Sequence, residues 1–346
     1  MARKATAQDV ADLAGVSRSA VSLVLNGRAS GHISLEKQKA VFAAAAQLSY
    51  TPNAVAISLR SQRTRTIGVL TWSSHAALPD PILRAARLRA HEDQYLLLLM
   101  DTGGDADRGQ RQLETLRDRQ VDGFLVVAPD ITHYEPSELL LSLPTVLLNC
   151  VDPEGGLTSV VADEVEVGRC GAEVLLEQGH RRVGLLTGSL GDLHVALRVR
   201  GVGQAFVGAG LSPPTPVVAG RQIDDGYRAA SQVLGEPDRP TAFICTAERL
   251  AVGAVLAAAE LGVPVPDALS LVSLEDAEGL APTLVPPLTS VHRPYAAMAQ
   301  EAVAQLVARL ADPVPAEVRQ LLFHCQVHHR SSVAPPGEAG GRPASR

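Results

Sequence analysis

The distribution of apolar residues changes character near residue 65. Up to Leu48, apolar positions recur at the three- and four-residue spacing of helices. The last of these helices is expected over residues 34–48. From Ile67 onward, short apolar runs alternate with longer amphipathic stretches. This change predicts a small helical head followed by a larger α/β body.

The pattern in the head predicts two short helices separated by a tight turn. Thr6 and Asp9 form a capping-box pair ahead of an apolar stripe, and Gly15 tolerates the left-handed conformation of a turn. Ser17 can cap a second helix that stops at Asn26. This pattern is typical of a helix-turn-helix, although an ordinary helical hairpin has it too.

The body repeats its strand–helix alternation in two sets. Such alternation implies parallel sheets with helices on both faces, and two sets favour two lobes over one wide sheet. Ligands of such sheets bind at the carboxyl ends of the strands, so the expected site is a cleft between the lobes. The expected strands are 67–70, 95–100, 123–128 and 145–148, then 183–186, 217–218, 242–245 and 269–274.

Charge is distributed unevenly between the two parts. The chain has 346 residues and a net charge of −6. Residues 1–65 contain nine Lys or Arg against three acids, a net of +6, so the remainder carries −12. A basic head on an acidic body is typical of a DNA-reading module attached to a soluble sensor.

The cysteine and hydropathy patterns argue against a disulfide-rich, zinc-binding, secreted or membrane protein. Four cysteines, at positions 150, 170, 245 and 325, stand singly, so neither a disulfide framework nor a zinc site is indicated. Cys325 lies near His324, His328 and His329, for which a C-terminal strand is favoured over a metal site. No signal peptide opens the chain and no apolar run approaches 18 residues, so we expect a cytoplasmic protein without a membrane segment or cofactor.

Two stretches carry a specific resemblance. Residues 6–27 read TAQDVADLAGVSRSAVSLVLNG and residues 50–59 read YTPNAVAISL, which resembles the start of the LacI family of bacterial transcriptional repressors. The resemblance extends to about Ser332. It implies an N-terminal all-α helix-turn-helix head and an α/β core of two doubly wound parallel-sheet lobes, as in type I periplasmic binding proteins. The implied parts are a DNA-binding domain (1–50), a hinge helix and linker (51–65), and an effector-binding and dimerisation domain (66–332). The tail (333–346) is rich in Pro, Gly, Ala and Ser, and this composition predicts disorder.

The resemblance also assigns the head's contacts with DNA. The second helix reads bases in this family, which places Arg18, Ser19 and Ala20 at its exposed start, and Arg18 can make two hydrogen bonds with guanine. Where members often carry Arg, this chain has Leu23, so its operator should differ from the commonest ones. The side chains suited to phosphate contacts are Thr6, Ser17, Ser22 and Asn26.

The hinge has its own implied role. In the family this segment folds on DNA, pairs with its twin in the minor groove and inserts a leucine between base pairs. The matching positions here are Asn53, Ala56 and Leu59. The alternative is that Leu59 is an ordinary core residue.

The resemblance is weakest in the cleft. Members commonly carry Asn-Asp and Phe-Asp-Asp where this chain has Ala247-Glu248 and Leu274-Glu275-Asp276. These departures imply a different ligand or none. The candidate effector-binding residues are Trp72, His75, Arg198, Glu248 and Glu275. The alternatives are that Trp72 caps the sheet, that Arg198 pairs with Asp192, and that the two glutamates are solvated.

We therefore expect a homodimeric repressor of a sugar or carbohydrate-utilisation operon. It would bind a palindromic operator and respond to a small polar effector. An activator and an effector-independent regulator remain open alternatives. An enzyme using Glu248, Glu275 and His75 is disfavoured, because the chain has no nucleophile elbow, P-loop or metal-ligand spacing. The basic head and the missing signal peptide exclude a bare solute-binding protein.

Overall fold

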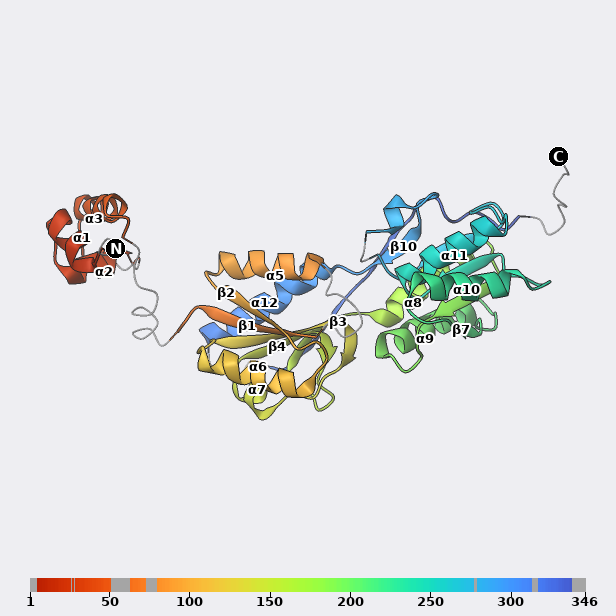
Figure 1. The fold of residues 1–346 in the computed structure, drawn as a ribbon, viewed down its shortest axis with the longest axis horizontal. Helices are drawn as coiled ribbons and strands as arrows, with labels where there is room; N and C mark the ends of the chain where they lie inside the picture. The colour runs from red at the N-terminus through yellow and green to blue at the C-terminus, as the bar shows by residue number, and fades with distance from the viewer. Residues whose placement is uncertain are drawn as a thin grey trace. The chain divides into compact units, whose positions relative to one another are not determined.

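The computed structural model describes residues 5–25, 27, 29–50, 63–72, 80–276, 279–312 and 317–337 (Figure 1). The chain forms two compact units, Met1–Arg65 and Thr66–Arg346. The predicted hinge helix, with Asn53, Ala56 and Leu59, lies outside the described residues.

The first unit is a bundle of three short helices, as the pattern predicts. They are α1 (Ala7–Ala14), α2 (Arg18–Leu25) and α3 (Leu35–Gln47). Their apolar stripes meet in one small core. Its buried residues are Val10, Ala11, Val21, Val24, Ala29, Val41, Ala44 and Ala45.

The turn between α1 and α2 is fixed by local hydrogen bonds. Thr6 Oγ1 accepts from the Asp9 backbone N–H at 3.3 Å, and Asp9 Oδ2 accepts from the Thr6 backbone N–H at 2.7 Å, which completes the predicted capping box. Gly15 ends α1 with φ 64°, where a side chain would be strained. Ser17 Oγ accepts from the Ala20 backbone N–H at 3.2 Å and so caps α2.

The first lobe of the body is an all-parallel sheet of six strands in the order β11-β5-β4-β3-β1-β2. Helices α5 (Asp80–Glu92) and α12 (Tyr295–Ala311) pack on one face. Helices α6 (Ala106–Asp118) and α7 (Glu138–Ser142) cover the other (Figure 1). The strands are β1 (Thr66–Thr71), β2 (Leu96–Asp101), β3 (Gly123–His133), β4 (Thr145–Val151), β5 (Thr158–Ala162) and β11 (Gln320–Phe323).

The second lobe has the same plan, in the order β12-β10-β9-β8-β6-β7, with β12 antiparallel at the edge. Helices α8 (Glu164–Glu177) and α9 (Leu193–Gly208) cover one face. Helices α10 (Ile223–Leu234) and α11 (Glu248–Glu260) cover the other, and a 3-10 turn spans Ala281–Thr283. The strands are β6 (Val183–Thr187), β7 (Pro216–Val218), β8 (Ala242–Cys245), β9 (Ser270–Ser273), β10 (Thr289–His292) and β12 (Gln326–His328).

The two predicted lobes are confirmed, but the chain is shared between them. It passes from one lobe to the other between β5 and α8, between β10 and α12, and between β11 and β12. The sequence pattern had not predicted β5, β10, α12 or β11, whereas β12 lies where a C-terminal strand was expected around His328. Helix α9 begins at Leu193 and therefore includes Arg198.

Helices α8 and α9 approach each other through glycine. A Cβ at Gly168 would lie 3.0 Å from the Cα of Arg198 and closer still to its carbonyl oxygen. A Cβ at Gly201 would lie 2.8 Å from the backbone nitrogen of Arg169. Backbone-to-backbone packing of this kind holds Arg198 near the start of α8.

The tail is ordered further than predicted. Val333 packs against the core of the second lobe, and the carbonyl oxygen of Ala334 accepts from the Ser270 hydroxyl at 3.0 Å and lies 2.9 Å from His180 Nε2. The prediction of disorder was therefore wrong for residues 333–337. Residues 338–346 lie outside the described part of the chain.

Candidate functional site

The start of α2 offers an exposed cationic side chain on the head. Arg18 and Ser19 are exposed, and Ala20 is half-buried. Within the residues that the structure describes, Arg18 makes no hydrogen bond or ion pair, whereas Ser19 Oγ lies 2.8 Å from Ser17 Oγ. The capped helix start thus presents Arg18 outward, as base reading requires.

The predicted phosphate contacts are placed in part. Thr6 and Ser17 are exposed at the starts of α1 and α2, Ser22 is half-buried, and Asn26 lies outside the described residues. A groove beside the start of α2 adds polar side chains that sequence reasoning missed. These are His32, Ser34 and Lys37, which line it together with Ser17 and Ala20.

The second site lies at the carboxyl ends of the strands in the body. Five charged side chains meet there, and we call them the cleft cluster. They come from β3 in the first lobe, from the start of α8, from α9, and from the segments after β9 and β10. In that order they are Asp130, Glu164, Arg198, Glu275 and Arg293.

Arg198 is fully buried in this cluster. Its Nε donates to Glu164 Oε2 at 2.7 Å, and its Nη1 donates to the carbonyl oxygen of Thr246 at 2.5 Å. The predicted alternative, a pair with Asp192, does not form. Asp192 instead accepts from Arg221 at 3.2 Å. Nη2 of Arg198 has no hydrogen-bond partner among the described residues.

Arg293 is the centre of the cluster and was missed by the sequence analysis. Its Nη1 donates to Glu164 Oε1 at 2.9 Å and Asp130 Oδ1 at 3.2 Å, and its Nη2 donates to Glu275 Oε1 at 2.6 Å. The guanidinium lies 4.7 Å from the ring centroid of Tyr295, which adds a cation–π contact. Arg293 directly follows β10, a strand that the sequence pattern had not predicted, so no signal in the sequence pointed to it.

Two carboxylates of the cluster, Glu164 and Asp130, have a lowered pKa despite their burial. Burial opposes the charge of Glu164, but Arg198 and Arg293 outweigh it, so the pKa of Glu164 is lowered. Burial likewise opposes the charge of Asp130. His194 and the arginines Arg293, Arg198 and Arg221 outweigh it and lower the pKa of Asp130.

Neither predicted glutamate is solvated, so that alternative was wrong. Glu248 is fully buried, and its Oε1 accepts from the Ala281 backbone N–H at 2.7 Å. Glu275 bonds Arg293 through one oxygen, and the other accepts from the Glu248 backbone N–H at 3.3 Å. Both carboxylates therefore belong to the buried hydrogen-bond network at the strand ends.

The aromatic candidate, Trp72, already contacts another side chain of the protein. Trp72 is half-buried at the end of β1 and stacks on Tyr134, with ring centroids 5.3 Å apart and planes at 12°. It packs against the core of the first lobe, as the alternative interpretation expects. His75 lies outside the described residues.

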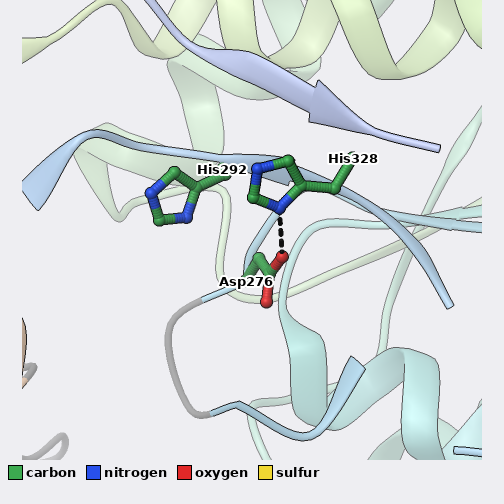
Figure 2. A group of neighbouring side chains, drawn as sticks. All are labelled: Asp276, His292 and His328. Atoms are coloured by element: carbon green, nitrogen blue, oxygen red, sulfur yellow. Dashed lines mark hydrogen bonds and ion pairs between the residues drawn. The ribbon is translucent and has the colours of Figure 1, made fainter. Parts of the chain in front are cut away.

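A third polar group lies at the edge of the second sheet. Asp276, His292 and His328 bring their ligand-type atoms within 4.8 Å of one another (Figure 2). Asp276 Oδ2 is hydrogen-bonded to His328 Nδ1 at 2.9 Å, Arg330 Nη2 at 2.8 Å and Ser290 Oγ at 2.8 Å.

This group is built for hydrogen bonding. The two imidazoles stack with planes at 14° and centroids 4.9 Å apart, so their in-plane lone pairs do not converge on one point. The guanidinium of Arg330 supplies the positive charge that a metal ion would otherwise bring. The group fastens β12 to β10, in agreement with the strand predicted around His328.

Two family models match the chain. The model for bacterial regulatory proteins of the lacI family matches residues 6–53, and the model for a periplasmic binding protein-like domain matches residues 172–333. A helix-turn-helix head on such a body defines a DNA-binding regulator.

Curated relatives and solved structures that resemble the chain are also bacterial transcriptional regulators. The chain is 34% identical to the ribose operon repressor of Haemophilus influenzae, over 89% of this chain and 93% of the relative. It is 32% identical to the HTH-type transcriptional repressor PurR of Escherichia coli, over 95% and 97%. The lac repressor dimer bound to operator and the anti-inducer ONPF superposes with a TM-score of 0.80 at 25% identity, over 96% and 100%. A complex of the regulator CelR with cellobiose gives 0.68 at 25% identity, over 95% and 99%.

The chain belongs to the LacI family and is a DNA-binding transcriptional repressor of that type. Repressors of this kind bind DNA operators, dimerise and bind small-molecule effectors, and the relatives are regulators rather than enzymes. Among the described residues, no helix is both long and apolar enough to cross a membrane.

Proposed function

We propose that the protein represses a sugar or carbohydrate-utilisation operon in the cytoplasm, by binding a palindromic operator as a homodimer. The observation that supports DNA binding is the exposed Arg18 at the capped start of α2, which has no hydrogen bond or ion pair with another described residue. The assignment to a sugar or carbohydrate operon is supported by two similar proteins, a ribose operon repressor and a regulator in complex with cellobiose.

Within this proposal Arg18 reads a guanine through two hydrogen bonds, while Ser19 and Ala20 make weaker base contacts. Phosphate contacts by Thr6, Ser17, Ser22 and Asn26 set the register of the head. The hinge residues Asn53, Ala56 and Leu59 enter the minor groove at the centre of the operator, where Leu59 unstacks one base step.

The cleft cluster is the proposed effector site. Nη2 of Arg198 and Nε of Arg293 are buried donors without an acceptor among the described residues, and a ligand oxygen would satisfy them. Glu248 and Glu275 supply acceptors for ligand hydroxyls, and Trp72 and His75 complete the proposed set of effector-binding residues. Because both arginines already hold carboxylates of the chain, a repressor that needs no effector is the second candidate.

Measurements of operator binding test the proposed DNA-binding function. Fluorescence anisotropy of the full-length dimer on a selected palindrome should show affinity falling steeply with salt, as about 6–10 phosphate contacts require. An operator affinity that does not change with salt would refute the proposed DNA-binding function.

Effector binding is tested by calorimetry of the full-length protein against monosaccharides and disaccharides, repeated on Arg198→Ala and Glu275→Ala. We expect binding that both substitutions abolish and that changes operator affinity by about 5–150-fold. Tight binding that survives both substitutions would place the effector elsewhere. Failure of every sugar, with operator binding intact, would favour a non-sugar effector or none.

A further inference from the structure

Two arginines converge on the carboxylate of Asp130, which projects from β3 in the first lobe. Asp130 Oδ2 accepts from Arg221 Nη2 at 3.2 Å, and Oδ1 accepts from Arg293 Nη1 at 3.2 Å. Both arginines follow strands of the second lobe. Two guanidinium groups around one carboxylate is an arrangement by which proteins bind carboxylate and phosphate ligands. Here a side chain of the protein itself fills it.

The surroundings of this carboxylate favour an anion over a neutral group. The side chain of Arg293 is 2% exposed and that of Asp130 is 15% exposed, so this pair is largely removed from water, whereas Arg221 is 37% exposed. A neutral hydroxyl in place of the Asp130 carboxylate would remove one of the negative charges that balance Arg293 and Arg221. An incoming anion would restore the balance.

The neighbouring donors extend the same site. Nε of Arg293 and Nη2 of Arg198 are buried, and neither has an acceptor among the described residues. A ligand that combined an anionic group with further oxygens would satisfy both the Asp130 position and these donors.

We infer that the effector carries a carboxylate or phosphate group that takes the place of Asp130 between Arg221 and Arg293. Asp130 then acts as an internal competitor of the effector. Displacing it also breaks the ion pair between β3 of the first lobe and Arg221 of the second, which links anion binding to the arrangement of the lobes. This inference rests on the effector cleft proposed above and specifies the chemistry of its ligand.

The test is chemical rescue of the full-length protein. In Asp130→Ala the space between the guanidinium groups is vacated, and sodium acetate or inorganic phosphate should fill it. We expect either anion, at ten times its Kd, to raise the midpoint of thermal unfolding by about 3–5 °C over sodium chloride of equal ionic strength. Neutral acetamide should give no such rise. The larger response of acetate or of phosphate identifies which group the effector carries.

Two further variants define the site. Asp130→Ala combined with Arg221→Gln should lose most of the rescue, because Arg221 is one of the two guanidinium groups. Glu173→Ala is the matched control, since Glu173 pairs with Arg169 at 2.7 Å on an exposed surface of α8. Neither anion should stabilise that variant beyond the effect of sodium chloride.

A second measurement tests the inference even if Asp130→Ala does not fold. The isosteric Asp130→Asn should bind inorganic phosphate at least about tenfold more tightly than the wild type, because the tethered competitor has lost its charge. Anions that stabilise Asp130→Ala no more than chloride does, or an unchanged phosphate affinity in Asp130→Asn, would overturn the inference. Loss of operator binding by the wild type would instead refute the proposed function.

Discussion

Replacing Gly201 by alanine tests how α8 and α9 position Arg198. The added Cβ would lie 2.8 Å from the backbone nitrogen of Arg169 and closer to the carbonyl oxygen of Val165. Carbon–oxygen contacts ordinarily begin at about 3.3 Å, so the helices must separate by at least about 1 Å. Because both obstacles are backbone atoms, no side chain can move aside.

The separation would also break a buried ion pair. Arg198 Nε lies 2.7 Å from Glu164 Oε2, and an added ångström would take it to roughly 3.7 Å, beyond hydrogen-bonding distance. Overpacking costs about 1–3 kcal/mol, and a broken buried pair about 3–5 kcal/mol. We expect Gly201→Ala to lower the free energy of unfolding by at least about 3 kcal/mol.

Urea unfolding followed by circular dichroism measures this loss. The control is Gly208→Ala at the end of the same helix, where an added Cβ would meet nothing within 4 Å. That change should leave stability unaltered or raise it by up to about 1 kcal/mol, because alanine is the better helix former. A wild-type midpoint for Gly201→Ala, or equal losses in both variants, would refute the reasoning.

Three further predictions concern the capping box, pH and the hinge. Thr6→Ala should speed hydrogen exchange of the α1 amides by about 2–30-fold, since an N-cap contributes about 0.5–2 kcal/mol; unchanged exchange would mean the cap contributes nothing. Folding lowers the pKa of His194 from 6.5 to about 4, chiefly through burial, so the unfolded chain binds more protons between these values. The free energy of unfolding should therefore fall as pH drops from 6.5 towards 4, and His194→Gln should flatten this slope in urea titrations; an equally steep slope in that variant would exclude His194 as a source. Leu59→Ala should reduce operator bending and affinity without changing thermal stability, whereas a large loss of stability with unchanged bending would place Leu59 in a core.

Local patterns predicted most of the elements and the two lobes, because periodicity and caps act over a few residues. The head shows this directly: Thr6 with Asp9, Gly15 and Ser17 each play the structural part that their spacing predicts. The alternation of strands and helices likewise needs only the buried face of each segment.

Partners distant in sequence were not predictable in the same way. Strand β11 pairs with β5, whose residues lie far earlier in the chain, and no single-sequence pattern specifies that partner. The role of Arg198 shows the same limit. Its position was expected to clamp a ligand, but its pairing with Glu164 depends on close approach of α8 and α9, which only the packed fold reveals.

Base-specific reading by Arg18 is the claim on which the account most depends. The measurement is anisotropy titration of wild type and Arg18→Ala on the selected palindrome and on every single-base variant of one half-site, at fixed salt. We predict a loss of about 1–3 kcal/mol per half-site, with discrimination abolished at a single base position. An equal loss on all sequences, with discrimination unchanged at every position, would contradict the account.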